Sequence, residues 1–349
     1  MNNIPDFRLT MGGTDLRGTL FDEAMQLLDI TAKVRPRLIS LGLTEKRGEE
    51  ADQLDLVLDD TRGDFELPPT GATLQLQIGW KQGADVTPGL VDKGRFIVDE
   101  VSHDGPPDRI TIKARAADFA SDSKTRREKA YHDTTLGAIV AEVAARMRVK
   151  PRCAEALAAI AIRTKVQSRE SDLAFLRRLG REHGAVAKIA GGALILSPIG
   201  AGVTPSGKTL PTLTIRRRDG DAHQFTRQKR DDVPGVQATW HDREAGKRRT
   251  FTAGKVDGAK KLARVYSTDE AAATAANTAL AKAGREPVSL SLTLALGRPD
   301  VAPEQRTSVS GYKAAIDAIG WLVTEVEHSI GDRGFTTKLK LEAVSALEG

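Results

Sequence analysis

Hydrophobic and polar residues alternate in short runs along the first part of the chain, and turn-forming residues separate the runs. The clearest runs are 54–58, 74–78, 96–101 and 110–113. Strict alternation predicts half-buried β-strands, because successive side chains of a strand point to opposite faces. The Gly- and Pro-containing segment 104–107 is expected to join two of these strands as a hairpin. Several short strands at this spacing favour a small antiparallel barrel or sandwich.

The hydrophobic period lengthens after residue 118. Apolar residues recur every three or four positions over 136–147, behind capping candidates at 133–135, which predicts a helix. A second helix is expected over 171–183, because a glycine that can end it follows, and a short strand is expected over 193–196. Residues 119–200 are therefore predicted to form a small α/β unit.

Strand-like runs return in the last part of the chain, and one Ala-rich segment interrupts them. This segment opens with Asp269 and Glu270, continues to Ala283 and is followed by Gly284. Acidic residues at the start and glycine after the end favour a helix, so a helical insertion is predicted at about 259–285. Strands are expected at 212–216, 236–240, 290–296 and 321–326.

The two ends of the chain contain similar segments. Residues 96–103 align with 321–328, and without a gap the strand at 110–113 then falls on 335–338. Chance similarity between two amphipathic hairpins is one interpretation, and duplication of one barrel is the interpretation we favour. Identical pairs are Val98/Val323, Glu100/Glu325, Val101/Val326, His103/His328, Thr111/Thr336 and Lys113/Lys338. At a different spacing, Leu54, Leu56 and Leu58 resemble Leu290, Leu292 and Leu294.

These patterns predict an α+β fold that is mainly β. A first tube-like antiparallel barrel is expected over 1–118, a small α/β domain over 119–200, and a second, similar barrel with the helical insertion over 201–349. In a homo-oligomer with closed symmetry, each domain of the chain is repeated once per subunit. A trimer of such a chain would display six like barrels in a near-sixfold ring. An object of this kind can join a threefold partner to a sixfold one.

Composition and charge narrow the classes of function. Hydrophobic residues make up 40% of the chain and charged residues 28%, as in a soluble globular protein. We expect neither a secretory signal nor stable membrane insertion, because the N-terminus lacks an apolar region and no apolar run is long enough. The net charge is +5, but the basic clusters are scattered and lack interleaved aromatics, so nucleic-acid binding is not expected. The single cysteine, Cys153, excludes an intrachain disulfide.

Several motifs suggest chemistry that their surroundings do not support. Residues 202–209 match the P-loop pattern, but a Pro-containing, β-branched run follows where a helix is required. The six histidines lack metal-ligand spacing, and His103 and His328, at matching hairpin positions, are expected to form turn-stabilising hydrogen bonds. The acid pairs at 49–50 and 59–60 fall at strand ends or in loops, where solvated acids are common. We therefore expect no catalytic residue, no metal and no cofactor.

Three segments, 50–59, 167–179 and 321–337, together resemble a known family. The middle segment carries the pattern Q…ESD..FL.RL. In order and spacing, the three resemble the late-control D proteins, which are the tail hubs of contractile phages. They are more distantly similar to the hub portion of VgrG proteins of type VI secretion. The positions singled out as signature or structural residues are Asp52, Ser171, Asp172, Phe175, Leu176, His103, Trp321 and His328.

The resemblance implies a non-catalytic hub at the centre of a contractile tail baseplate, made in the bacterial host cytoplasm and built into the virion tail. It implies a homotrimer with a pseudo-sixfold ring that joins a trimeric spike to the hexameric tail tube or a tube-initiator protein. Other baseplate and tape-measure components are further expected partners. The chain carries no long β-helix repeat, so the spike is expected to be a separate protein. A peptidoglycan hydrolase-type tail enzyme and a nucleic-acid-binding module remain alternatives, and the particle could be a phage, a tailocin or another injection system.

Overall fold

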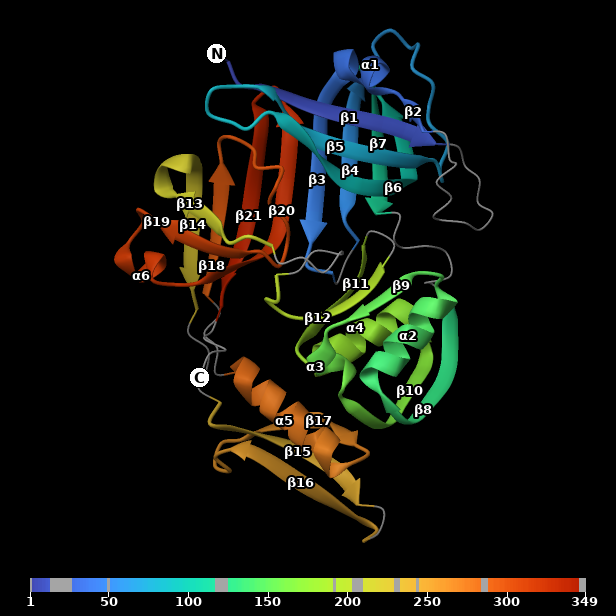
Figure 1. Cartoon of the computed structure of the whole chain (residues 1–349), viewed down its shortest axis with the longest axis vertical. Coiled ribbons are helices and arrows are strands. Elements are labelled where there is room, and N and C mark those ends of the chain that lie inside the picture. The colour runs from blue at the N-terminus through green and yellow to red at the C-terminus, as the bar shows by residue number, and fades with distance from the viewer. Residues whose placement is uncertain are drawn as a thin grey trace.

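The computed structural model of the chain describes residues 2–12, 27–48, 51–116, 125–190, 193–202, 210–228, 233–242, 245–283 and 288–344. Figure 1 shows two neighbouring parts of a large β-sheet, a unit in which helices pack on strands, and a small sheet covered by one helix. Four separate hydrophobic clusters correspond to these parts. The described chain combines helices with a majority of strands, which confirms the prediction of an α+β fold that is mainly β.

The first sheet half contains strands that hydrogen-bond in the order β3-β4-β7-β6-β5-β1, with the short β2 beyond β1. Alternating side chains of these strands are buried, as the period-two pattern predicts. The elements are β1 (Ile4–Gly12), β2 (Leu28–Asp29), α1 (Thr31–Val34), η1 (Arg35–Arg37), β3 (Leu38–Lys46), β4 (Gln53–Asp59), β5 (Thr73–Gln82), β6 (Gly89–Asp104) and β7 (Arg109–Ala116).

The second sheet half has the strand order β14-β18-β21-β20-β19-β13. Its core is filled by apolar side chains that include the fully buried Trp321. The elements are β13 (Leu213–Arg216), η3 (Arg217–Asp219), β14 (Gly220–Arg227), β18 (Val288–Leu294), β19 (Arg306–Ser310), α6 (Ala314–Asp317), β20 (Trp321–Gly331) and β21 (Gly334–Ala343).

The two halves have the same strand order. Taken in chain order, β1, β3, β4, β5, β6 and β7 correspond one by one to β13, β14, β18, β19, β20 and β21, and the pairing path is the same in both. Leu54 pairs with Ala114 in the first half, and Leu290 pairs with the equivalent Leu341 in the second, so the resemblance of the two leucine strands is confirmed in register. One difference is that β1 runs antiparallel to β5, whereas β13 runs parallel to β19.

The ungapped alignment of the two hairpins is wrong by two residues in the second strand. The register shifts between Val98 and Glu100 in β6 and between Val323 and Glu325 in β20, so the first strands align as expected. However, His103 pairs with Ile110, whereas His328 pairs with Thr337. The second hairpin is therefore two residues longer, and 110–113 corresponds to 337–340 rather than to 335–338.

The halves do not form two separate closed barrels among the described strands. Instead, β3 pairs with β20, and the halves merge into a single 13-stranded sheet. Figure 1 shows β20 and β21 directly beside β3 and β4. The sequence predicted strands within each half, but it gave no signal for the pairing between them.

The middle unit confirms both predicted helices. In α2 (Leu136–Arg146) the Thr135 hydroxyl accepts a hydrogen bond from the amide of Ala138 at 3.2 Å, which caps the helix start. The second helix is α4 (Asp172–Glu182), and the predicted strand at 193–196 lies in β12 (Ala193–Pro198). The remaining elements are β8 (Arg126–Thr135), β9 (Lys150–Cys153), α3 (Glu155–Ala158), β10 (Ala161–Ser171) and β11 (Ala185–Ala190).

The insertion between β14 and β18 is larger than predicted and is not only helical. It contains the sheet β15 (Gly235–Asp242), β16 (Lys247–Gly254) and β17 (Lys260–Tyr266), covered by the Ala-rich helix α5 (Asp269–Ala283). Its own small core includes Val236, Ala238 and Ala276. The strand at 236–240 therefore belongs to this unit rather than to the second half. The P-loop-like residues 203–209 and the acid pair at 49–50 lie outside the described residues.

Candidate assembly sites

The seam between the two sheet halves is the first candidate site. Seven residue pairs join β20 to β3 in antiparallel register, from Glu325 opposite Lys46 to Gly331 opposite Ser40. The end of the β20/β21 hairpin also enters the core of the first half, where the Phe335 ring lies 5.3 Å from the Trp80 ring. Main-chain pairing and apolar burial therefore hold the halves together.

A buried polar cluster crosses this seam. Lys93 Nζ of β6 donates to Glu45 Oε2 of β3 at 2.7 Å, and only 5% of the Lys93 side chain is exposed. His328 of β20 is fully buried, with its Nε2 3.2 Å from the same Glu45 oxygen and its Nδ1 2.9 Å from Thr337 Oγ1. A neutral imidazole fits both contacts, because Nε2–H donates to the carboxylate and Nδ1 accepts from the hydroxyl.

The charges in this cluster depend on one another. Burial alone would raise the pKa of Glu45, but the charge of Lys93 and the hydrogen bond from His328 outweigh it and lower that pKa to about 2. Burial, assisted by the charge of Lys93, lowers the pKa of His328 from its ordinary value. The folded seam therefore contains an ionised Glu45 and a neutral His328 at neutral pH. All three ionisable side chains of the cluster thus have a polar partner within it.

A second polar junction ties the sheet to the middle unit. Glu304, just before β19, accepts a hydrogen bond from the amide of Gly200 at 2.6 Å and forms an ion pair with Arg47. Burial raises the pKa of Glu304, although Arg47 and the Gly200 amide oppose this effect. The backbone of Glu304 has φ +70°, and the equivalent position in the first half is Gly71, at φ +87°. A residue other than glycine at a positive φ costs about 1 kcal/mol or more. At this position the Glu304 side chain contacts Arg47 and the Gly200 amide, which a glycine could not do.

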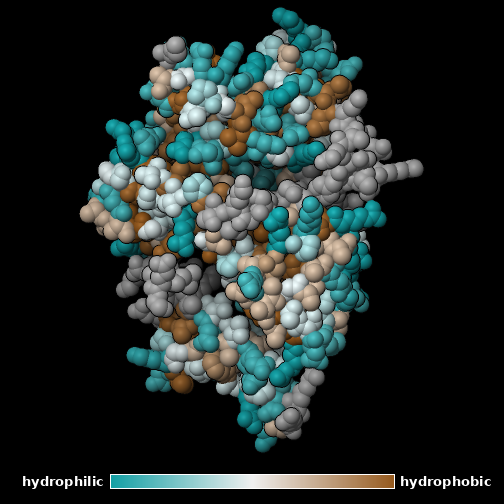
Figure 2. Space-filling model, viewed as in Figure 1, coloured by the Kyte–Doolittle hydropathy of each residue, from teal (hydrophilic) through white to brown (hydrophobic). Residues whose placement is uncertain are grey.

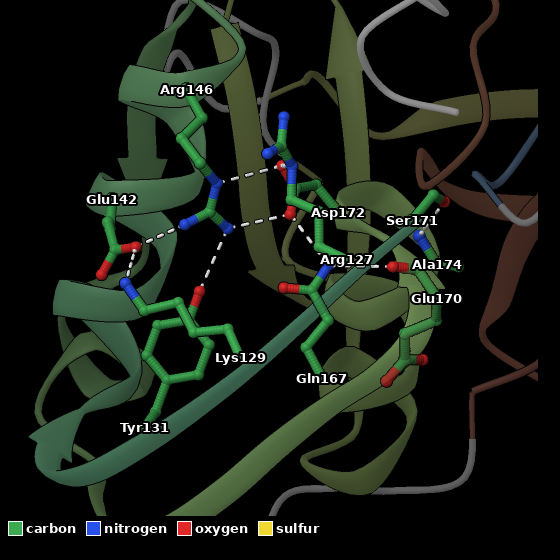
Figure 3. Close-up of polar contacts among 10 residues, drawn as sticks. All are labelled: Arg127, Lys129, Tyr131, Glu142, Arg146, Gln167, Glu170, Ser171, Asp172 and Ala174. Carbon is green, nitrogen blue, oxygen red and sulfur yellow. Dashed lines mark hydrogen bonds and ion pairs between the residues drawn. The ribbon is translucent and has the colours of Figure 1, made fainter. Parts of the chain in front are cut away.

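The segment 167–179, which carries the Q…ESD pattern, forms a third site inside the middle unit (Figure 3). The Asp172 carboxylate is 1% exposed and receives hydrogen bonds from Arg146 of α2 at 2.8 and 3.1 Å and from Gln167 of β10 at 2.9 Å. Arg127 of β8 approaches the same carboxylate at 3.4 Å. Arg146 also donates to the Tyr131 hydroxyl at 3.0 Å. One carboxylate therefore connects four elements of the unit.

Hydrogen bonds favour the ionised form of the Asp172 carboxylate. Burial alone would raise the pKa of Asp172, but the hydrogen bonds from Arg146 and Gln167 outweigh it and lower the pKa. Ser171 Oγ caps α4 by accepting a hydrogen bond from the amide of Ala174 at 3.3 Å. Ser171 and Asp172 are thus both engaged in holding the fold, and Glu170 of the same segment pairs with Arg178.

The predicted signature residues therefore fall in three places. Ser171 and Asp172 come together with Phe175 and Leu176, which are fully buried in the core of the middle unit. Trp321 and His328 lie on β20, where the Trp321 Nε1 donates to the carbonyl oxygen of Ile316 at 3.3 Å. The structure does not bring these groups to one site.

Asp52 and His103 lie in the first sheet half. The Asp52 carboxylate accepts a hydrogen bond from the amide of Lys46 at 2.8 Å and so closes the connection between β3 and β4. His103 is 42% exposed, and its Nε2 lies 3.4 Å from Asp60 Oδ2, at the base of the β6/β7 turn. The expected hydrogen bond within the hairpin is thus found for His328, with Thr337, whereas for His103 the structure shows a 3.4 Å contact with Asp60.

Sequence reasoning missed Glu45, Lys93, Arg47, Glu304 and Arg146. Each is a charged residue whose partner comes from a distant element, and charged residues on amphipathic strands normally face water. Nothing in their local spacing signals burial. Within the described residues, no three or more His, Cys, Asp or Glu side chains are grouped to hold a metal ion, and none of the helices could span a membrane.

The residues at these sites are engaged in joining parts of the chain. The chain belongs to the phage tail baseplate hub (GPD) family, whose sequence model matches residues 53–334. It is a tail component of the virion, as the proteins of this family are. This confirms the resemblance described above.

Known proteins support the assignment over most of the chain. The chain is 39% identical to the probable baseplate hub protein of Escherichia phage P2, and the match covers 94% of this chain and 95% of that protein. Its fold is similar to a tail protein from Neisseria meningitidis MC58, with a TM-score of 0.66, 14% identity and 96% of each chain covered. It is also similar to a chain of the Francisella PdpA–VgrG complex, with a TM-score of 0.57, 12% identity, and 99% of this chain and 59% of that chain covered.

Proposed function

We propose that the chain is the structural hub of a contractile tail baseplate, in which three copies form a ring that joins a trimeric spike to the hexameric tail tube. The observation that carries this proposal is the identical strand order of the two sheet halves within one chain. Three copies would present six like halves, which gives threefold symmetry and approximates sixfold symmetry. The spike would be a separate protein, and the tube or a tube initiator, other baseplate proteins and the tape measure would be the neighbours.

The proposal is tested by counting subunits. Light scattering on the full-length protein, alone and with its spike protein, is expected to give three times the 37.5 kDa chain mass in at least one of the two samples. Averaged electron micrographs of that species, viewed along its axis, should show a ring of six similar densities with threefold symmetry. A monomer in both samples would refute the trimeric ring.

A structural role is favoured over hydrolysis by two observations on the carboxylates: Glu304, whose pKa is raised, is buried and paired with Arg47, and two acids of a surface groove have basic partners. A general acid of the glycosidase kind needs a raised pKa and a second carboxylate nearby. The groove of about 1240 Å³ between the middle unit and the insertion contains Glu182 and Glu270. Burial opposes ionisation of Glu182, but Lys165 and Arg178 outweigh it and lower its pKa, while Glu270 pairs with Arg163 at 3.3 Å.

Both alternatives have direct assays. Peptidoglycan suspensions should show no loss of turbidity with the purified protein, and clearing comparable to a wall hydrolase would establish the enzyme instead. Filter binding of DNA across a salt titration should show only weak retention, because scattered basic residues neutralise few phosphates at once. Tight retention that falls steeply with salt would favour the nucleic-acid module.

A further inference from the structure

The β20/β3 pairing at the seam can be compared with the equivalent strand edges in the opposite halves. Among the described strands, two of those edges have no partner strand. Within the chain, the outer edge of β20 over 325–331 is covered by β3. The equivalents of β20 and β3 in the opposite halves are β6 and β14. Among the described strands, β14 pairs only with β18, and β6 pairs with β5 only as far as Ile97. Val98 bonds to the backbone of residues 71–72, and beyond it residues 99–104 have no partner strand on this edge within the described part of the chain.

The equivalence can be stated residue by residue, because both halves carry β-bulges at matching places. In the first half the register of β3 and β4 shifts between Leu38 and Ser40, and in the second half that of β14 and β18 shifts between Gly220 and Ala222. Since Leu54 and Leu290 are equivalent, their partners Leu43 and Phe225 are equivalent too. Bulges are specific features of a strand pair and so make reliable markers of register.

We propose that β6 of one copy pairs antiparallel with β14 of a second copy, in the register of the internal seam. Transferring that seam places Val101 opposite Arg227, Ser102 opposite Thr226 and His103 opposite Phe225. This proposal rests on the proposed function, because it names the contact that would repeat around the ring. The sheet of each copy then continues into the sheet of the next.

The occupant of each edge is a second copy because the two edges complement each other. Within one chain they cannot meet, since β14 ends the sheet on one side while β6 lies beyond the seam on the other (Figure 1). A contact between two different edges is heterologous, and such contacts build rings when the rotation closes. It also removes open strand edges, which otherwise promote unspecific aggregation.

The surface chemistry points the same way. Obligate subunit contacts usually bury broad apolar areas, but Figure 2 shows a face on which hydrophobic side chains form small areas among polar ones. Pairing at an open strand edge does not depend on such an area, because main-chain hydrogen bonds hold it. The exposed large hydrophobic residues are spread along the described chain: Ile4, Leu28, Ile39, Leu67, Leu90, Val166, Ile199, Val256 and Val265.

The register is tested with pairs of cysteines in a Cys153→Ser background of the full-length protein, assembled under the conditions that give the trimer. The Ser102→Cys, Thr226→Cys protein places one cysteine on each proposed edge, at opposed positions where a disulfide fits. Under mild oxidation it should form covalently linked trimers on a non-reducing gel. A register-shifted control, Ser102→Cys with Gln224→Cys, should give at least about tenfold less linked product, because displaced Cα atoms cannot be bridged.

The internal seam supplies a positive control. Glu327 lies opposite Thr44, so the Glu327→Cys, Thr44→Cys protein should oxidise within one chain and remain a single-chain band. If trimers form by light scattering while the matched pair gives no more product than the shifted pair, this proposal is wrong and the trimeric hub stands. If no oligomer forms and no pair links chains, both proposals fail.

Discussion

The two hairpins β20/β21 and β6/β7 show how one module has been adapted to two settings. Both bend at the same bulge, and both carry the same ion pair across their strands, Glu325–Lys340 at 2.8 Å and Glu100–Lys113 at 3.1 Å. The histidine that follows is fully buried in the second hairpin, as His328, and 42% exposed in the first, as His103. The framework is shared, whereas the environment is not.

The difference follows from what covers each hairpin. The β20/β21 hairpin is covered by β3, and its tip residues Ile330 and Phe335 enter the core of the first half. The shorter β6/β7 hairpin ends instead in the largely exposed turn 105–108. In the second hairpin, the apolar strand ends are therefore buried by a contact within the same chain. A polar end suits a surface that stays soluble until assembly.

The two hairpins are expected to differ most in how far a substitution at the tip lowers the free energy of unfolding. Replacing Phe335 by alanine removes a buried ring against Trp80 and should lower the free energy of unfolding by about 3–5 kcal/mol. The equivalent change in the other hairpin, Asp108→Ala, should cost less than about 1 kcal/mol. Urea titration followed by tryptophan fluorescence measures both. Equal losses would mean that the two tips are held alike.

The next effect concerns the polar cluster of the seam. Lys93→Met leaves the ionised Glu45 buried beside His328, and breaking such a buried pair should cost about 3 kcal/mol. The matched control is Lys113→Met, which breaks the exposed pair with Glu100 and should cost less than about 1 kcal/mol. Thermal unfolding of the three proteins side by side gives the ranking. A Lys93→Met protein as stable as the control would show that the cluster does not hold the seam.

The sequence predicts this molecule well where the signal is local. Alternation at 54–58 and 74–78 gives β4 and β5, because each strand buries one face. Helical spacing behind Thr135 gives α2. The signature residue Asp172 was recognisable from its motif, although its main partner, Arg146, comes from a different helix and carries no mark of its own.

Where pairing joins distant parts of the chain, the sequence says little. Glu45, Lys93 and His328 lie on three strands, and their contact depends on the seam, which no local pattern encodes. The hairpin alignment failed for a related reason. The identities Thr111/Thr336 and Lys113/Lys338 are coincidences on two alternating strands, and only strand pairing exposes the two-residue difference in hairpin length. Side-chain identity alone cannot fix a register whose period is two.

The smallest expected effect separates the two histidines by pH. Because the pKa of His328 is lowered in the folded chain, the unfolded chain binds a proton there that the folded chain does not. Stability is therefore full above the ordinary histidine pKa and falls as pH drops below about 6.5, by at most ~1.4 kcal/mol per pH unit. Below about pH 4.5 the loss should steepen, because Glu45, with its pKa of about 2, stays ionised only in the folded chain.

The groups that face His328 are Glu45 on β3, Lys93 on β6, Thr337 on β21 and, at longer range, Asp300 before β19. Unfolding midpoints measured between pH 7.5 and 5 should therefore fall less steeply in His328→Gln than in the parent, since the variant has no imidazole to protonate. His103→Gln removes the matching imidazole from the other hairpin and is the control. If the His328→Gln slope equals that of the parent, burial at the seam does not keep this histidine neutral, and the contrast between the two hairpins is one of exposure without an electrostatic consequence.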